Sequence, residues 1–115
     1  MHLEALRAYC LSLAAVTEDV KWDHDLCFSI GGKMFCVASM EPPFSFSFKV
    51  DAEDFQALSA MPGLSPAPYL ARYHWVLANE GHTLSSQEIE HRVRESYELI
   101  KSKLPKKVLK EAGLL

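Results

Sequence analysis

The segment from Phe44 to Val50 constrains the fold more than any other part of the sequence. Phenylalanine recurs at every second position and is followed by Val50, while serine and lysine occupy the positions between. A period of two places the two sets of side chains on opposite faces of a β-strand. The segment therefore predicts a strand in a sheet with one apolar face, which a second layer must cover, and one polar face.

Two shorter alternating segments precede this strand and are joined by a pair of glycines. Apolar residues alternate over residues 26–30 and again over residues 34–39. Gly31-Gly32 lies between them, and both glycines can adopt the positive φ of a tight hairpin turn. Pro42-Pro43 ends the second segment, because proline cannot donate to a strand ladder. The sequence therefore predicts an antiparallel meander of three strands.

Helical periodicity is predicted at both ends of the chain. Residues 3–14 repeat apolar side chains every three or four positions, which gives one apolar helix face. Near the other end, Ser85 and Glu88 form a capping box before an apolar helical pattern that ends at Pro105. A basic and then apolar tail, residues 106–115, follows and could add a short turn.

The remaining segments complete the order of elements. Asp51 is predicted to cap a helix over residues 52–60, and residues 69–78 are predicted to form a strand. The acidic segment 17–25 is predicted to be a polar loop. The order is helix, three strands, helix, one or two strands and helix. It predicts an α+β protein of two layers, with the helices packed on one face of an antiparallel sheet.

The composition indicates one cytoplasmic domain spanning residues 1–115. Hydrophobic residues make up 49% of the chain, enough for a core that needs no metal or disulfide. No apolar run approaches the ~20 residues of a bilayer span, and the first residues lack the features of a secretory signal. Cys10, Cys27 and Cys36 form no CxxC pair and are predicted to be free thiols. We expect a monomer with no membrane partner.

No pattern of residues indicates catalysis or a cofactor. The chain contains no GxSxG, P-loop or GxGxxG sequence, so it offers no support for a nucleophile elbow, ATP or a dinucleotide. Asp23-His24-Asp25, with Glu18 and Asp19 nearby, could ligate a metal, but no second group completes the set. We therefore expect no enzyme activity, no catalytic residue, no metal site and no cofactor.

Several local strings, taken in order, resemble the MmcQ/YjbR family over about residues 6–104. They are residues 10–13 with 16–18, the hairpin 31–35, the segment 66–76 and the helical string 96–100. The resemblance implies an α-β(3)-α-β(2)-α arrangement similar to CyaY-like (frataxin-like) and secretion-chaperone-like folds, in a bacterial cytosolic protein. It also implies DNA binding through a double-wing surface. Fold analogy alone is a weak warrant for function.

The charges give this DNA hypothesis limited support. The net charge is −3, which argues mildly against nucleic acid, yet the last fifteen residues hold five of the twelve basic residues. These five lysines could contact phosphates or serve the negative end of a helix dipole. In the predicted strand 69–78, alternation places Arg72 and His74 on the polar face, and Trp75 is predicted to fill the core beside Phe46 and Phe48.

Two functional hypotheses follow. The first is a non-enzymatic protein of uncharacterised role that binds DNA mainly through phosphates; the second is a protein–protein adaptor or chaperone-like module. Surface lysines that only confer solubility are the alternative explanation for several of the DNA-binding candidates. These candidates are Lys33, Lys49, Arg72, His74, Lys101, Lys106 and Lys107.

Overall fold

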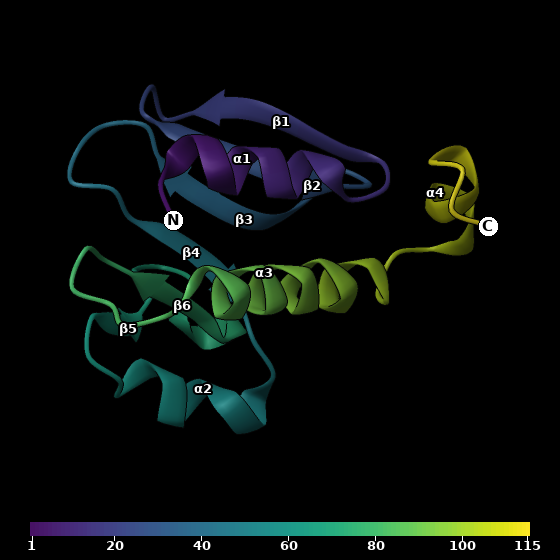
Figure 1. Cartoon of the computed structure of the whole chain (residues 1–115). Coiled ribbons are helices and arrows are strands. Elements are labelled where there is room, and N and C mark those ends of the chain that lie inside the picture. Colours follow the sequence, from purple (N-terminus) through teal and green to yellow (C-terminus); the bar gives the residue numbers. More distant parts are fainter.

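The computed structural model describes all 115 residues and contains one antiparallel sheet in the order β1-β2-β3-β4-β6-β5 (Figure 1). The predicted α+β class is confirmed. The strands are β1 (Val16–Lys21), β2 (Asp25–Ile30), β3 (Lys33–Ser39), β4 (Phe46–Lys49), β5 (Leu64–Pro66) and β6 (Trp75–Ala78). The helices are α1 (Leu3–Ser12), α2 (Ala52–Ser59), α3 (Ser86–Lys101) and α4 (Lys106–Glu111), with a 3-10 turn η1 (Ala71–Tyr73).

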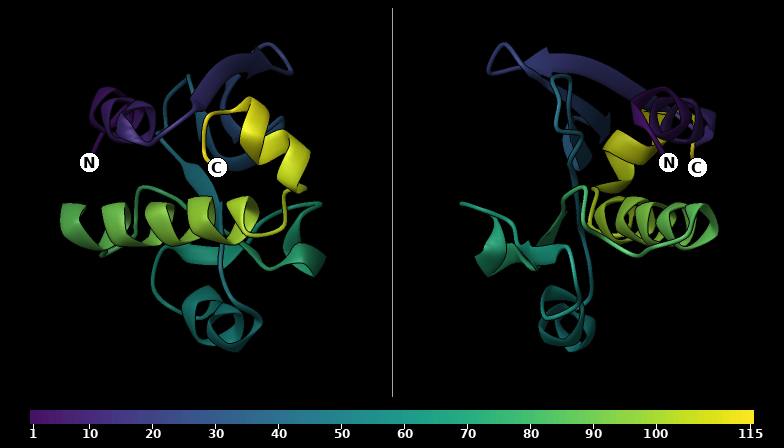
Figure 2. Two further views of the ribbon diagram at one scale, coloured as in Figure 1. Left: turned by 90° about the vertical axis from the view of Figure 1, so that its right-hand side faces the viewer. Right: turned by 60° about the vertical axis from the view of Figure 1, so that its left-hand side comes forward.

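Helices α1 and α3 lie side by side on one face of the sheet, which we call the covered face (Figure 2). Helix α2 packs against β5 and β6. No helix packs on the other face of β3 and β4, which we call the open face. None of the helices combines the length and apolarity needed to cross a membrane.

The covered face holds the main core. Phe28, Cys36, Phe48 and Val76 lie opposite one another across four strands, and all are fully buried. Phe46 also belongs to this core, so the face predicted from the alternation of residues 44–50 is correct. The three cysteines are free, in agreement with the sequence prediction, and all three are buried.

A β-bulge increases the number of aromatic side chains in this core. The register between β2 and β3 shifts after Phe28, which leaves Phe35 as the extra residue. Phe35 and Cys36 are consequently both fully buried, and the Phe35 ring meets that of Tyr97 edge to face at 5.4 Å. The buried Ser96 Oγ donates to the Phe35 carbonyl at 2.6 Å and accepts from the Lys49 N–H at 2.9 Å. One hydroxyl thus joins α3 to β3 and β4.

The predicted loop 17–25 is wrong over most of its length, because β1 occupies Val16–Lys21 as an edge strand. Both faces of β1 carry polar side chains, so the segment lacks the apolar–polar alternation that predicts a strand. Glu18 faces α1, where its carboxylate binds Arg7 through nitrogen–oxygen distances of 2.7 and 2.8 Å. This ion pair lowers the pKa of Glu18. A charged edge also protects a sheet against pairing with another chain.

The predicted strand 69–78 is also too long, since β6 begins only at Trp75 and η1 precedes it. Tyr69 and His74 both have left-handed backbone conformations, with φ of 66° and 65°, which interrupts an extended strand. Trp75 is buried as predicted, but it lies opposite Lys49 in the ladder and outside the main core. Its predicted place beside Phe46 and Phe48 is therefore wrong.

Two helix caps test the sequence predictions differently. Ser85 and Glu88 form the predicted capping box at the start of α3. Asp51 occupies the N-cap position of α2, but its side chain accepts no capping hydrogen bond.

The C-terminal α4 packs on the β2–β3 hairpin. A Cβ placed on Gly31, whose φ is 57°, would lie 2.7 Å from Val108 and 2.8 Å from Leu104. Glycine is therefore needed at Gly31 both for the turn and for the approach of the tail.

Candidate functional site

The structure gathers most of the basic residues at one end of the molecule, the end where α4 lies in Figure 1. The β2–β3 hairpin, the last residue of β4, the turn before β6 and the end of α3 meet there. Eight of the twelve basic residues lie in these elements, and we call them the basic end. They are Lys33, Lys49, Arg72, Lys101, Lys103, Lys106, Lys107 and Lys110.

Lys49 and Arg72 are linked through Tyr73. The Lys49 Nζ donates to the Tyr73 carbonyl at 2.5 Å. The Arg72 guanidinium lies 4.8 Å from the centre of the Tyr73 ring and donates to its hydroxyl at 2.6 Å. Burial and the nearby charge of Lys103 lower the pKa of Lys49. Both candidate side chains therefore already have partners within the protein.

The strand alternation that predicted one face for Arg72 and His74 is absent, because both residues precede β6. The His74 ring meets that of Phe55 at 5.4 Å, which ties His74 to α2. Lys101 lies 5.8 Å from the Tyr97 ring.

The other candidates of the basic end are free. Lys33, Lys106 and Lys107 are exposed and take part in no ion pair. The exposed, unpaired positive charge at this end is thus carried by the hairpin, by α4 and by Lys103 just before α4.

A second feature, which the sequence did not reveal, is a cavity of about 660 Å³ on the open face. We call it the open-face pocket. Trp22 and His24 from the β1–β2 turn line it, as do Asp25 at the start of β2 and the segment 68–70 before η1. Its strand residues include Met34, Val37, Ser47 and Leu77.

Two aromatic side chains of the open-face pocket are unusually accessible. Trp22 is 61% exposed and Tyr69 is 98% exposed, and both have left-handed backbones with φ of 55° and 66°. They are far apart in sequence, so no local motif joins them. The signal available in the sequence was a tryptophan within the polar segment 17–25.

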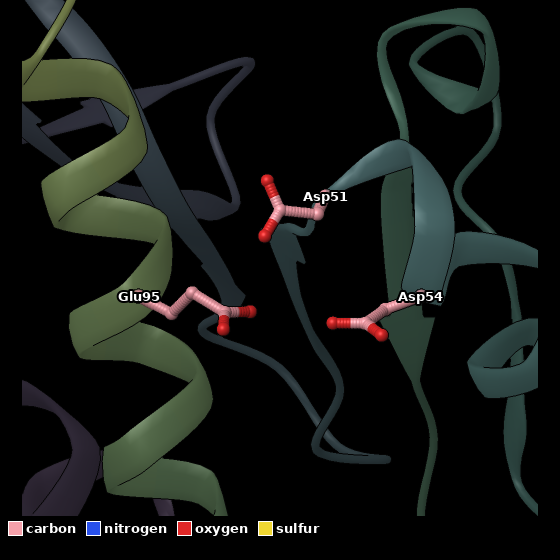
Figure 3. A group of neighbouring side chains, drawn as sticks. All are labelled: Asp51, Asp54 and Glu95. Carbon is pink, nitrogen blue, oxygen red and sulfur yellow. The ribbon is translucent and has the colours of Figure 1, made fainter.

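An acidic cluster lies between α2 and α3. Ligand atoms of Asp51, Asp54 and Glu95 all lie within 4.8 Å of one another, and Figure 3 shows the three side chains converging. Arg92 donates to Asp54 at 3.3 Å and to Glu95 at 3.1 Å, so a protein cation already serves two of these carboxylates. The metal-type residues noted in the sequence, Asp23 to Asp25 with Glu18, do not form such a cluster.

Comparisons with known proteins place this arrangement among solved structures. A Deinococcus radiodurans protein, DR2400, described as having a DUF419 domain, is 28% identical with a TM-score of 0.86; the match covers 99% of this chain and 89% of that one. A Pseudomonas syringae protein is 18% identical with a TM-score of 0.74, over 87% of this chain and 99% of that one, and shows the fold alone. No curated protein matches the chain.

The family comparison agrees with the resemblance found in the sequence. The sequence model described as YjbR matches residues 11–99, which is most of the chain and includes every strand of the sheet. The chain belongs to the YjbR family.

Proposed function

We propose that this protein is a non-enzymatic nucleic-acid-binding protein whose basic end contacts the phosphates of duplex DNA. The contacts are electrostatic and independent of base sequence. A row of lysines presents point charges, whereas base recognition needs side chains such as Arg, Asn and Gln placed to reach base edges in a groove.

The observation that carries the proposal is the uneven distribution of charge. The chain has a net charge of −3, yet eight of its twelve basic residues belong to the basic end. The remaining four are distributed over α1, β1 and α3, and two of them, Arg7 and Arg92, are held in ion pairs. A protein polarised in this way attracts a polyanion to one end despite its overall negative charge.

The internal contacts of the basic end predict which lysines matter most. Lys49 and Arg72 bind Tyr73, so a phosphate would compete with partners that they already have. Lys106 and Lys107 are exposed on α4 and have no such partner. We therefore expect α4 to provide the larger share of the phosphate contacts.

Salt dependence of binding to a generic DNA duplex tests the proposal. Each phosphate contact adds roughly 0.9 to the slope of log affinity against log salt concentration. Changing Lys106 and Lys107 together to glutamine should therefore lower the slope by about two without changing the preference among duplex sequences.

The matched control removes the same charge elsewhere. Lys21 and Arg94 lie outside the basic end and form no ion pair, so their double change to glutamine should alter the slope little. Equal effects of the two double variants would show that only net charge matters. Absence of binding at low ionic strength, with circular dichroism showing an intact fold, would refute the proposal.

A further inference from the structure

We propose that the open-face pocket is a second binding site, which takes a small organic cation. Trp22 and Tyr69 offer aromatic surface to a flat apolar group of the ligand, and its protonated amine lies beside Asp25. This proposal is independent of the basic end, because none of the basic residues there lines the pocket.

The size and lining of the pocket suit a small molecule. Its volume of about 660 Å³ is within the range of roughly 300–1,000 Å³ that is typical of ligand sites. Val37, Ser47 and Leu77 lie directly opposite one another on three neighbouring strands and form a continuous strip of its surface. The ladder fixes these positions, so this part of the pocket is rigid.

The two exposed aromatic residues supply the part of the site that recognises a flat group. Tyr69 is 98% exposed, so its ring makes almost no contribution to the core, and its φ of 66° is costly for a residue with a side chain. Trp22 combines exposure and a left-handed backbone in the same way. Strained residues of this kind gather at ligand sites, where the surrounding fold holds them in place. Aromatic faces attract both apolar groups and cations.

The charge of the pocket selects a cation. Asp25 is the one carboxylate among the lining residues, and no lysine or arginine lines the pocket. The ion pairs of the molecule use only Arg7 and Arg92 as cations, so no basic side chain pairs with the Asp25 carboxylate. Lys21 lies opposite Asp25 in the ladder, and Asp19 lies two residues along β1 on the same face, so these three side chains together carry one net negative charge. An unpaired carboxylate beside apolar surface favours an amine over a neutral or anionic group.

Three probes of similar shape and different charge test this proposal: 2-phenylethylamine, 2-phenylethanol and 3-phenylpropionate, at constant ionic strength and neutral pH. Trp22 reports binding by its fluorescence, since the second tryptophan, Trp75, is only 4% exposed. We expect the amine to bind about tenfold more tightly than the carboxylate, with the alcohol between them.

Variants identify the site and its selectivity. Asp25→Asn should remove most of the preference for the amine, whereas Glu4→Gln, which loses an exposed charge on α1, should keep it. Tyr69→Gly should weaken all three probes by a similar factor. Equal affinities of the three probes would overturn the assignment of a cation, as would an unchanged preference in Asp25→Asn. The absence of any saturable response in the unaltered protein would overturn the site itself.

Discussion

The two faces of the sheet use the same strands in opposite ways. On the covered face, Phe48 and its neighbours across the ladder are fully buried beneath α1 and α3. On the open face, Ser47 and Leu77 line a cavity whose rim carries exposed aromatic rings. Ser47 and Phe48, adjacent residues of β4, thus lie in a surface cavity and in the closed core respectively.

This contrast separates stability from binding. Burial of apolar area and satisfied hydrogen bonds stabilise the covered face. The open face instead leaves Met34, Val37 and Leu77 only partly buried, and it holds Trp22 and Tyr69 in unfavourable backbone conformations. Substitutions on the two faces should therefore differ in size and, for one residue, in sign.

The largest difference is expected for paired truncations. Phe48→Ala should lower the free energy of unfolding by ~3–5 kcal/mol, because it leaves a cavity in the core. Leu77→Ala on the open face should cost less than ~1.5 kcal/mol, since Leu77 is only partly buried. Urea denaturation of both variants would measure these two losses, provided that the m-values are equal. Similar losses would show that the open face contributes as much to stability as the covered face.

A smaller difference is expected for two serines. Ser96→Ala removes a hydroxyl that serves both the Phe35 carbonyl and the Lys49 N–H, so it should cost ~1–3 kcal/mol. Ser47→Ala is the matched control, because the Ser47 hydroxyl makes no hydrogen bond within the protein despite being largely buried. It should change the free energy of unfolding by less than ~0.5 kcal/mol. A Ser96→Ala change that leaves the free energy of unfolding almost unaltered would show that this hydroxyl does not stabilise the bulge.

The smallest effect should have the opposite sign. Tyr69→Gly relieves a left-handed backbone and loses almost no packing, although glycine also gains freedom in the unfolded chain. We expect the free energy of unfolding to stay the same or rise by up to ~1 kcal/mol. Thermal and urea unfolding would test this. A clear loss of stability would mean that the Tyr69 ring supports the fold and does not serve a ligand.

The sequence predicted the covered face well because the physical cause was local. Alternating phenylalanines, a glycine pair and a capping box each act within a few residues, and all three lie where they were expected. The edge strand β1 was not predicted, because Glu18 is polar yet faces the covered side of the sheet, where Arg7 of α1 pairs with it. That partner comes from another element, so periodicity could not supply it.

The candidate sites show the same division. The lysines of the basic end were visible as a charged tail, but their meeting with Lys33 and Lys49 depends on the packing of α4 and the order of the strands. Arg72 and His74 were predicted to share one face of a strand, but two left-handed residues replace the start of that strand with a turn. A left-handed backbone at a tyrosine such as Tyr69 has no strong sequence signal.

By itself, the sequence determined the α+β class, the apolar face of the sheet and the family, because these depend on periodicity and on the order of short strings. Only the tertiary structure decided where functional groups meet. The open-face pocket joins Trp22 to Tyr69 across the sheet, and the bulge at Phe35 receives its hydrogen bond from Ser96 on a distant helix. Such contacts follow from strand order and helix packing, which bring together residues that share no local pattern.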